Sequence, residues 1–340
     1  MGDRVLLTGI SGFLGGHVAL ALLNAGYIVR GSVRGLAKSA KVRATLAASG
    51  ADLSRLEFVE LDLLGDKGWT EAMEGVRYLQ HTASPFVIKQ PRDRGELIRP
   101  AVEGTRRALE AALSAEIERI VLTSSMAAIM YGHDKARTAP FTAADWTTPE
   151  ASDVSAYTES KVRAEKAAWA IMDRANRHND LVTINPGSIL GPLLDDDPGT
   201  SVGLLARMFD GSLPAAARFY QVIVDIRDVA EAHVKAMTTA AAGGQRFPMG
   251  SGSLSLMEMA DVLRPAIPER AGKLPRFEAP NWLVRIFAFV DEDARGNIGE
   301  LGVKKIADSS AVTALLGHQL ISPQEATIAA ARSLIAQGVA

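Results

Sequence analysis

The sequence predicts an α/β fold in which a doubly wound parallel sheet is followed by a smaller, mostly helical C-terminal lobe. Short apolar runs alternate with longer stretches of helical periodicity over the first part of the chain. The runs are apolar throughout rather than at every second residue, as in strands that are covered on both faces. Strands separated in this way by helices build a parallel sheet. Beyond Gly187 the rhythm weakens, and loops rich in proline and glycine separate the remaining helices.

The expected elements follow one another along the chain. The predicted strands lie in the segments RVLLTG, YIVRGSV, LEFVELD, VRYLQHTAS, IERIVLTSS and LVTINPGSI. The predicted helices span residues 12–25, 37–49, 99–115, the segment around Tyr157, 256–264 and 323–336. We expect the nucleotide-binding domain to span 1–187, with 221–250 returning to it, and the lobe to comprise 188–220 and 251–340.

Composition and charge exclude several classes of function. The chain has 340 residues and a formal net charge of −2, which gives no electrostatic basis for binding nucleic acid or a membrane surface. It has no cysteine, which excludes disulfides and thiolate metal sites, and its six histidines show no metal-ligand spacing. No apolar run is long enough to span a membrane, and the first residues resemble a strand rather than a signal peptide. We therefore expect a cytoplasmic protein without a metal site.

A glycine-rich turn joins the first strand to the first helix. In TGISGFLGG, Gly9 suits a tight bend, Gly12 the close approach of a pyrophosphate, and Gly15 close packing of helix on strand. The N–H groups and dipole at the start of the helix would receive the phosphates. This pattern predicts a Rossmann-type dinucleotide site, with a purely structural turn as the alternative. The residues expected to contact the cofactor here are Gly9, Ser11, Gly12, Phe13, Leu14 and Gly15.

The end of the second strand indicates which dinucleotide is bound. Binders of NAD commonly carry an acidic residue there for the ribose 2′-hydroxyl. This chain has no Asp or Glu between Asp3 and Asp52, and basic residues gather instead. These residues are Arg30, Arg34, Lys38, Lys41 and Arg43. A 2′-phosphate needs charge-assisted donors, so we expect NADP(H), with Arg34 as the main contact and Lys41 beside it. The alternative is a solvated basic helix.

Three residue types needed for carbonyl chemistry occur further along the chain. Ser124 and Ser125 end an apolar strand, where a doubly wound sheet places its ligands. Tyr157 and Lys161 are spaced one helical turn apart, so they share one face. A phenol with an ordinary pKa near 10 is a poor acid at neutral pH unless a cation favours its phenolate, and Lys161 is spaced to act in that way. An ordinary surface contact is the alternative for the pair.

The ordered set of motifs resembles the extended short-chain dehydrogenase/reductases, in particular the dihydroflavonol 4-reductase-like branch of NADPH-dependent aldehyde and ketone reductases. The resemblance covers nearly the whole chain. It is carried by TGISGFLG, VRGSVR, LDLL, HTASPF, VEGTRRALEAA, VLTSSMAAI, AYTESKVRAEKAAW, INPGSILGP, VDIRDVAEAHV and RFPMGSGSLSLMEMADVL. As a set the motifs are specific for the family and much less so for the substrate.

The resemblance implies a role for each matching residue. Ser125 would bind the substrate carbonyl and Tyr157 would donate the proton, while Lys161 would favour the phenolate and bind the nicotinamide ribose. Further implied cofactor contacts are Asp62, Leu63, Thr82, Ala83, Ser84, Thr123, Pro186, Gly187 and Ser188. The residues expected to contact substrate are Phe86, Ser125, Met126, Tyr157, Met208 and Tyr220. Asp225 and Arg227 are expected to position backbone between the two parts of the chain.

The expected function is reduction of an aldehyde or ketone by NADPH. Hydrophobic residues around the site favour an apolar or aromatic substrate, and a monomer and a homodimer are both open. A sugar-nucleotide epimerase with retained NAD shares the fold and the Ser-Tyr-Lys set and is the main alternative. A non-catalytic NADP sensor is the other. We further expect His81 to be a hydrogen-bonded core residue and His233 to lie on an exposed helix face.

Overall fold

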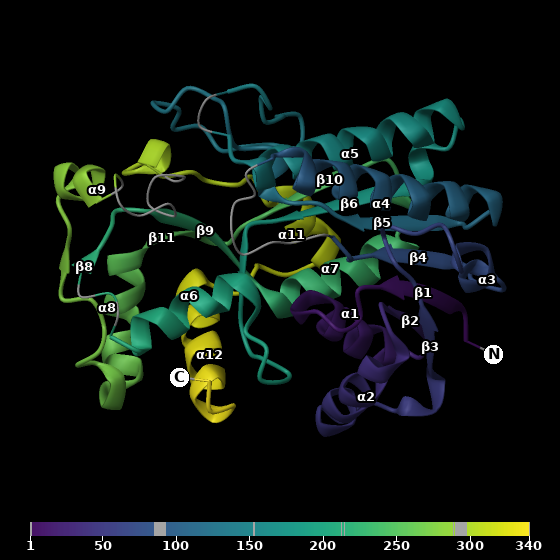
Figure 1. The fold of residues 1–340 in the computed structure, drawn as a ribbon, viewed down its shortest axis with the longest axis horizontal. Helices are drawn as coiled ribbons and strands as arrows, with labels where there is room; N and C mark the ends of the chain where they lie inside the picture. The colour runs from purple at the N-terminus through teal and green to yellow at the C-terminus, as the bar shows by residue number, and fades with distance from the viewer. Residues whose placement is uncertain are drawn as a thin grey trace.

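The computed structural model of the chain describes residues 2–84, 93–151, 154–211, 213, 215–287, 289 and 298–339, with the side chains of Thr200 and Phe287 left out. Its elements form a sheet domain and a smaller lobe beside it (Figure 1). Within these residues, no helix is both long and apolar enough to cross a membrane.

The sheet domain is built on seven parallel strands in the order β10-β6-β5-β4-β1-β2-β3 (Figure 1). The order reverses on either side of β1, as doubly wound sheets require. The carboxyl ends of β1 and β4 therefore border the crevice in which such sheets bind ligands. The strands are β1 (Arg4–Thr8), β2 (Ile28–Val33), β3 (Leu56–Glu60), β4 (Tyr78–His81), β5 (Arg119–Thr123), β6 (Leu181–Pro186) and β10 (Arg246–Met249).

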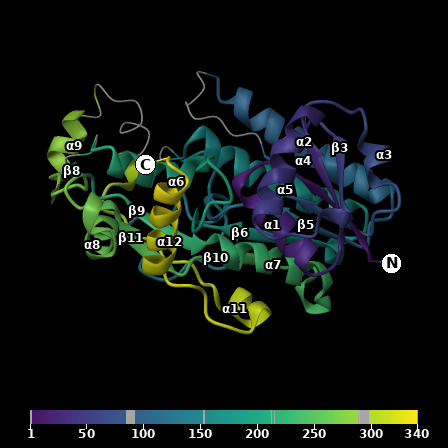
Figure 2. The same ribbon diagram turned by 90° about the horizontal axis from the view of Figure 1, so that it is seen from below.

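Helices cover both faces of this sheet. One face carries α1 (Phe13–Asn24), α2 (Ser39–Ala48) and α7 (Ile226–Thr238), and α1 and α7 contact each other along it (Figure 2). The other face carries α3 (Trp69–Met73), α4 (Gly95–Ser114) and α5 (Ala156–Arg174). α4 begins at Gly95, four residues earlier than the sequence predicts.

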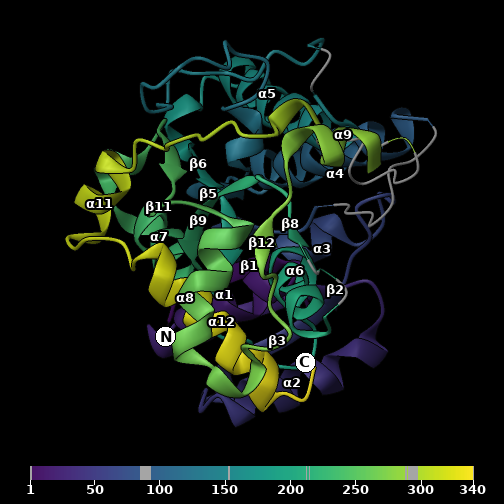
Figure 3. The same ribbon diagram turned by 90° about the vertical axis from the view of Figure 1, so that its left-hand side faces the viewer.

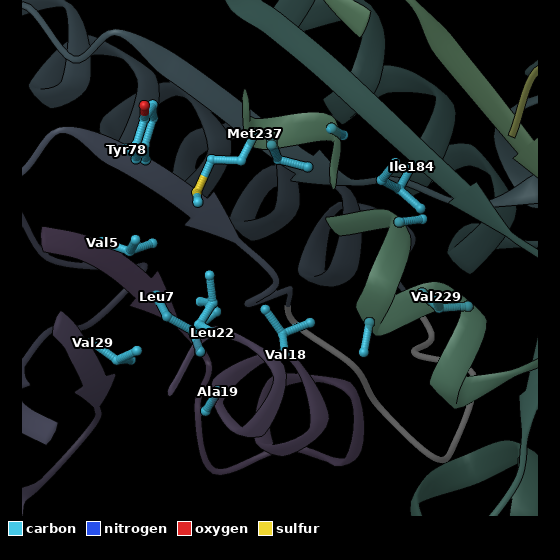
Figure 4. Packing of buried hydrophobic residues seen from close by; sticks show 14 of the residues in the cluster. Val5, Leu7, Val18, Ala19, Leu22, Val29, Tyr78, Ile184, Val229 and Met237 are labelled. Carbon is cyan, nitrogen blue, oxygen red and sulfur yellow. The ribbon is translucent and has the colours of Figure 1, made fainter. Parts of the chain in front are cut away.

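Alternation along β1 assigns its side chains to two separate hydrophobic cores. Val5 and Leu7 pack with Val18 and Leu22 of α1 (Figure 4), whereas Leu6 joins the core under α4 and α5. Each fully buried aliphatic side chain of this kind contributes about 1.5–3 kcal/mol. The uniformly apolar strands are thus explained by burial on both sides.

The lobe has two small sheets and its own core. Figure 3 shows the lobe facing the viewer, with α6, α8 and α12 near one another. Side chains of these helices form a hydrophobic cluster. The strands β11, β9 and β7 form one small sheet, and β12 pairs with β8. The remaining elements are β7 (Ser188–Leu190), α6 (Gly199–Phe209), β8 (Ala215–Ala216), β9 (Tyr220–Asp225), β11 (Gly252–Ser255), α8 (Leu256–Ala266), β12 (Phe277–Glu278), α9 (Asn281–Phe287), α11 (Ser310–Leu316) and α12 (Pro323–Ala336), with short 3₁₀ turns such as η1 (Leu36–Lys38) and η3 (Met126–Ala128).

Some segments belong to a different part of the molecule, sheet domain or lobe, than the predicted domain boundaries assign them to. α7 and β10 do return to the sheet domain, but β9 belongs to the small sheet of the lobe. In the other direction, α11 packs on α7 and β10, although it lies in the segment assigned to the lobe. Asp225 caps α7 and receives two side-chain hydrogen bonds of 2.9 Å from Arg227, which also pairs with Glu325 of α12 at 3.5 Å. These contacts fit the expectation that Asp225 and Arg227 position backbone between the parts.

Candidate active site

The glycine turn has the geometry of a phosphate-binding site. Gly9 adopts φ +75°, and a Cβ there would lie 2.9 Å from the Cα of Ala83, so β4 approaches the turn closely. A Cβ on Gly15 would lie 2.0 Å from the carbonyl oxygen of Gly9. A Cβ on Gly12 would meet only that same oxygen, at 3.5 Å, which is ordinary contact. The chain's own packing thus requires Gly9 and Gly15, whereas glycine at position 12 keeps open a surface that a ligand can approach.

The first turn of α1 leaves its backbone donors uncapped. Gly12 is the N-cap residue and makes no side-chain hydrogen bond to the helix. The N–H groups of a first turn need partners, and a pyrophosphate supplies suitable oxygens. The side chains of Phe13 and Leu14 pack inward against the two cores, so these residues and Ser11 can contribute through their backbone. The turn therefore fits a dinucleotide.

The basic residues within and after β2 divide into two groups. Arg34 is exposed at the end of the strand, in reach of solvent and ligands. Arg30 is instead structural, since it pairs with Glu57 at 3.2 Å and donates to backbone oxygens near α3. Arg43 donates to the Leu56 oxygen at 3.1 Å and lies over the Phe58 ring.

Lys41 has an unpredicted partner. Its Nζ lies 2.6 Å from Asp196 and 3.4 Å from Asp195, in the acidic segment that follows β7. The hydrogen bond to Asp196 raises the pKa of Lys41. A 2′-phosphate that binds Lys41 must therefore compete with two carboxylates of the same chain. Arg34 is the stronger candidate for binding the 2′-phosphate.

The residues after β3 and β4 line the same edge of the sheet. Asp62 accepts a hydrogen bond of 2.9 Å from the Leu64 N–H, and Leu63 packs against α4 beside Gly104. After β4, the Thr82 hydroxyl donates to the Thr8 oxygen at 2.6 Å. The Ala83 N–H donates to the Thr8 hydroxyl at 3.2 Å. These bonds fix the end of β4 against the glycine turn.

The predicted proton-transfer pair lies at this edge. Tyr157 falls in the first turn of α5, whose N-cap Ser155 accepts a hydrogen bond from the Thr158 N–H at 3.1 Å. The Lys161 Nζ lies 5.5 Å from the centre of the Tyr157 ring. The same Nζ donates to the Ser84 hydroxyl at 3.0 Å. One contact thus joins the Tyr-Lys helix to the strand end that borders the glycine turn.

The two strand-terminal serines have different surroundings. The Ser124 hydroxyl is buried and donates to Glu165 at 2.5 Å. The Ser125 hydroxyl is half-buried, accepts from the Ala127 N–H at 3.0 Å, and lies 3.5 Å from the Pro186 oxygen. Ser125 is the N-cap residue of η3, which packs on α5. Of the pair, Ser125 is the less buried residue.

A buried histidine, His233, contacts the predicted cofactor-binding residue Thr123. The Thr123 hydroxyl lies 3.0 Å from His233 Nε2, and His233 Nδ1 lies 2.8 Å from the Gln80 side-chain oxygen. His233 is fully buried, so its predicted exposed position is wrong: the face of α7 that carries it packs on the sheet. His81 is a satisfied core residue as predicted, 2.9 Å from the Thr8 hydroxyl. Burial lowers the pKa of His81 to about 4 and that of His233 to about 3.

The segment after β6 continues the same edge. Pro186 ends β6, and the Gly187 N–H donates to the Met249 oxygen at 2.9 Å. A Cβ on Gly187 would lie 2.3 Å from the Val222 oxygen, so only glycine lets β9 approach this closely. The Ser188 hydroxyl donates to Gln221 at 2.5 Å. This crossing carries the chain from the sheet domain into the lobe.

The residues predicted to contact substrate lie in different surroundings. Tyr220, at the start of β9, is half-buried, with Lys304 5.5 Å from its ring centre. Met126 and Met208 are each 0% exposed and packed in separate hydrophobic clusters. Neither side chain faces a substrate, and the prediction for both is corrected to core packing. Phe86 lies outside the described residues.

The site also contains groups that were not predicted. Glu165, Asn185 and Arg246 form a buried polar cluster behind Ser124. Glu165 repeats the helical spacing that joins Tyr157 to Lys161. Asn185 is a second polar residue in a mostly apolar run, two residues after Thr183. Both signals were available in the sequence.

Comparisons with known proteins agree with this geometry. The model of the NAD dependent epimerase/dehydratase family matches residues 5–250. The ketoreductase azaE of Aspergillus niger is 32% identical over 317 residues, 88% of this chain and 93% of that protein. A cinnamoyl-CoA reductase of Medicago truncatula is 36% identical over 255 residues, 72% of this chain and 75% of that protein. The Gre2 structure of Candida albicans in complex with NADPH has a TM-score of 0.78 and 26% identity, and the match covers 98% of this chain and 99% of that one.

The chain belongs to the NAD dependent epimerase/dehydratase family. This membership confirms the predicted resemblance to extended short-chain dehydrogenase/reductases and, with the seven-stranded sheet, the predicted fold class. The family description includes epimerases as well as dehydratases. The choice of reaction therefore depends on the residues of the site and on the individual relatives.

Proposed function

We propose that the protein is an NADPH-dependent carbonyl reductase that converts an aldehyde or ketone to an alcohol. The observation that carries the proposal is the 3.0 Å contact between Lys161 Nζ and the Ser84 hydroxyl. It joins the helix of Tyr157 and Lys161 to the strand end beside the Gly9 turn, where a dinucleotide would lie. The relatives named as reductases support the same reaction type.

The cofactor is NADP(H). The exposed Arg34 takes the position that an acidic residue occupies in binders of NAD, and the Candida albicans relative was crystallised with NADPH. A guanidinium forms paired, charge-assisted hydrogen bonds with a phosphate. Arg34 would hold the 2′-phosphate, and the uncapped first turn of α1 would hold the pyrophosphate.

Ser125, Tyr157 and Lys161 would each have a separate role in the reduction of the carbonyl group. NADPH, when bound, supplies the hydride. Ser125 would donate a hydrogen bond to the carbonyl oxygen, where negative charge develops. Tyr157 would give its phenolic proton to that oxygen as general acid. Lys161 would keep a positive charge beside the Tyr157 ring, which favours the phenolate left after proton transfer.

The substrate is proposed to be an apolar or aromatic carbonyl compound. Of the predicted lining residues, Tyr220 offers a half-buried aromatic ring at the start of β9 in the lobe. Its neighbour Lys304 lies over that ring. An aromatic ring suits an uncharged organic group.

Steady-state turnover tests the proposal. The purified protein is mixed with NADPH or NADH and a panel of aromatic and aliphatic aldehydes and ketones, and loss of reduced nicotinamide absorbance is followed. We expect turnover with NADPH and much weaker turnover with NADH. Absence of turnover, together with NAD retained in the purified protein, would instead favour a sugar-nucleotide epimerase.

A further inference from the structure

Glu165 is a buried carboxylate directly behind the proposed active site. It lies one helical turn after Lys161 on α5, and its side chain is 0% exposed. A buried carboxylate is costly unless hydrogen bonds and an opposite charge compensate it. Side chains from α5, from β6 and β10, and from the residue after β5 supply that compensation. The donors are Ser124, Trp169, Thr183, Asn185 and Arg246.

The two oxygens of this carboxylate face different groups. Oε1 accepts from Arg246 Nε at 2.6 Å and from the Trp169 indole at 3.3 Å. The Thr183 hydroxyl lies between two acceptors, 3.2 Å from Oε1 and 3.0 Å from the Asn185 side-chain oxygen. Oε2 accepts from the Ser124 hydroxyl at 2.5 Å and from the Asn185 amide at 2.7 Å. Oε2 is therefore the oxygen that faces the serine pair.

The serine pair is held from both sides by this arrangement. The Ser124 side chain is bonded to Oε2, and the Asn185 amide also lies 3.4 Å from the Ser125 carbonyl oxygen. The Ser124 N–H donates to the Ile184 oxygen at 2.8 Å. These hydrogen bonds restrict the backbone at Ser125. The restricted backbone in turn sets the direction of the Ser125 hydroxyl.

Arg246 anchors the far side of the carboxylate. Its guanidinium carbon lies 3.6 Å from the centre of the Trp146 ring, and its Nη1 donates to the Ala143 and Asp145 backbone oxygens. Well-packed hydrophobic residues of similar volume often stabilise a core as well as a buried ion pair does. A charged network is better suited to fixing one geometry, because each bond is directional.

We propose that Glu165 is a positioning residue for Ser125. Through Ser124 and Asn185 it fixes the backbone that presents the Ser125 hydroxyl, and it ties that backbone to the helix of Tyr157 and Lys161. The carbonyl-binding hydroxyl and the proton donor are thereby held at one separation. The inference rests on the carbonyl reductase function proposed above.

A matched pair of variants tests this role. Ser124→Ala removes a buried hydroxyl donor to Oε2. Trp169→Phe removes the indole N–H that donates to Oε1 and leaves the contact between Thr183 and Asn185 in place. For each variant kcat, KM, the NADPH dissociation constant and the melting temperature are measured, and crystal structures of both variants and of the wild type are determined. A misplacement of a reacting group by about 1 Å can cost about 100-fold in rate.

We expect Ser124→Ala to lower kcat about tenfold or more while the NADPH dissociation constant stays within about twofold. Trp169→Phe should also lower the melting temperature but keep kcat within about twofold, because Oε2 retains Ser124 and Asn185 as partners. Equal kcat losses in the two variants, or an unchanged kcat in Ser124→Ala, would overturn the inference. If the wild type reduces no carbonyl compound, the proposed function fails. The crystal structures then decide whether Glu165 positions Ser125. A Ser125 hydroxyl displaced by about 1 Å only in Ser124→Ala supports the positioning role, and an undisplaced one refutes it.

Discussion

Arg34 and Lys41 are both basic and close in sequence, but they differ in how readily each can bind a phosphate. Arg34 is exposed at the end of β2, whereas Lys41 is paired with Asp195 and Asp196. A phosphate must displace two carboxylates to bind Lys41, whereas Arg34 is exposed to solvent. Selection for the 2′-phosphate should therefore depend mainly on Arg34.

We predict that Arg34→Ala raises the NADPH dissociation constant about tenfold or more, the expected cost of one lost charge-assisted hydrogen bond. Lys41→Ala should have a smaller effect, since its charge is already compensated within the chain. Fluorescence titration with NADPH measures both, and NADH, which lacks the 2′-phosphate, serves as the control ligand. An unchanged NADPH affinity in Arg34→Ala would remove this residue from the cofactor site.

At the scale of an element, the start of α5 controls where Tyr157 lies. Ser155 caps this helix through the Thr158 N–H, and Tyr157 is in the first turn. α8 has a comparable cap: Ser255 accepts from the Glu258 N–H at 3.1 Å within a complete capping box. Both serines cap the N-terminus of a helix, but only α5 carries a proposed catalytic residue.

The caps form a matched experiment. We predict that Ser155→Ala and Ser255→Ala each lower the free energy of unfolding by about 1 kcal/mol. Only Ser155→Ala should also lower kcat, because fraying of the first turn of α5 displaces Tyr157. Urea unfolding and steady-state kinetics measure the two quantities. A similar kcat for both variants would show that the first turn of α5 keeps its geometry without its cap.

At the scale of the whole molecule, buried neutral histidines couple stability to pH. Burial lowers the pKa of His17 to about 4, as it does for His81, and lowers that of His233 to about 3. In the unfolded chain a histidine has a pKa near 6.5. The unfolded state therefore binds more protons than the native state below about pH 6.5, and stability must fall with acidification.

We predict that the free energy of unfolding is highest above about pH 6.5 and falls toward pH 4, by up to about 1.4 kcal/mol per pH unit for each such histidine. Urea unfolding between pH 7.5 and pH 4.5 measures the slope. His17→Gln should make the slope shallower, since one proton-binding group of the unfolded state is gone. A stability that stays constant or rises on acidification would mean that these histidines are protonated in the native protein.

The sequence predicted what depends on local pattern and missed what depends on packing between elements. The glycine turn, the strand-terminal serines and the spacing of Tyr157 and Lys161 are local, and the structure brings Lys161 and the turn to one edge of the sheet. The face of α7 that carries His233 could not be assigned, because this helix packs on both α1 and the sheet.

The lobe was harder to predict for the same reason. Met208 lies on a helix whose apolar face could point into a pocket or into a core, and only packing against α8 and α12 decides between them. The exchange of β9 and α11 between the two parts likewise joins segments far apart in the chain. Neither feature leaves a periodic signal in the sequence.

The most direct test of the central claim follows the transferred hydrogen. NADPH carrying deuterium on both positions of nicotinamide C4 is supplied with a carbonyl compound that the protein turns over, and the alcohol is analysed by mass spectrometry and NMR. The reductase account predicts one deuterium on the former carbonyl carbon, with product formation reduced at least about 100-fold in Tyr157→Phe. An alcohol without deuterium at that carbon, or full activity in Tyr157→Phe, would contradict the account.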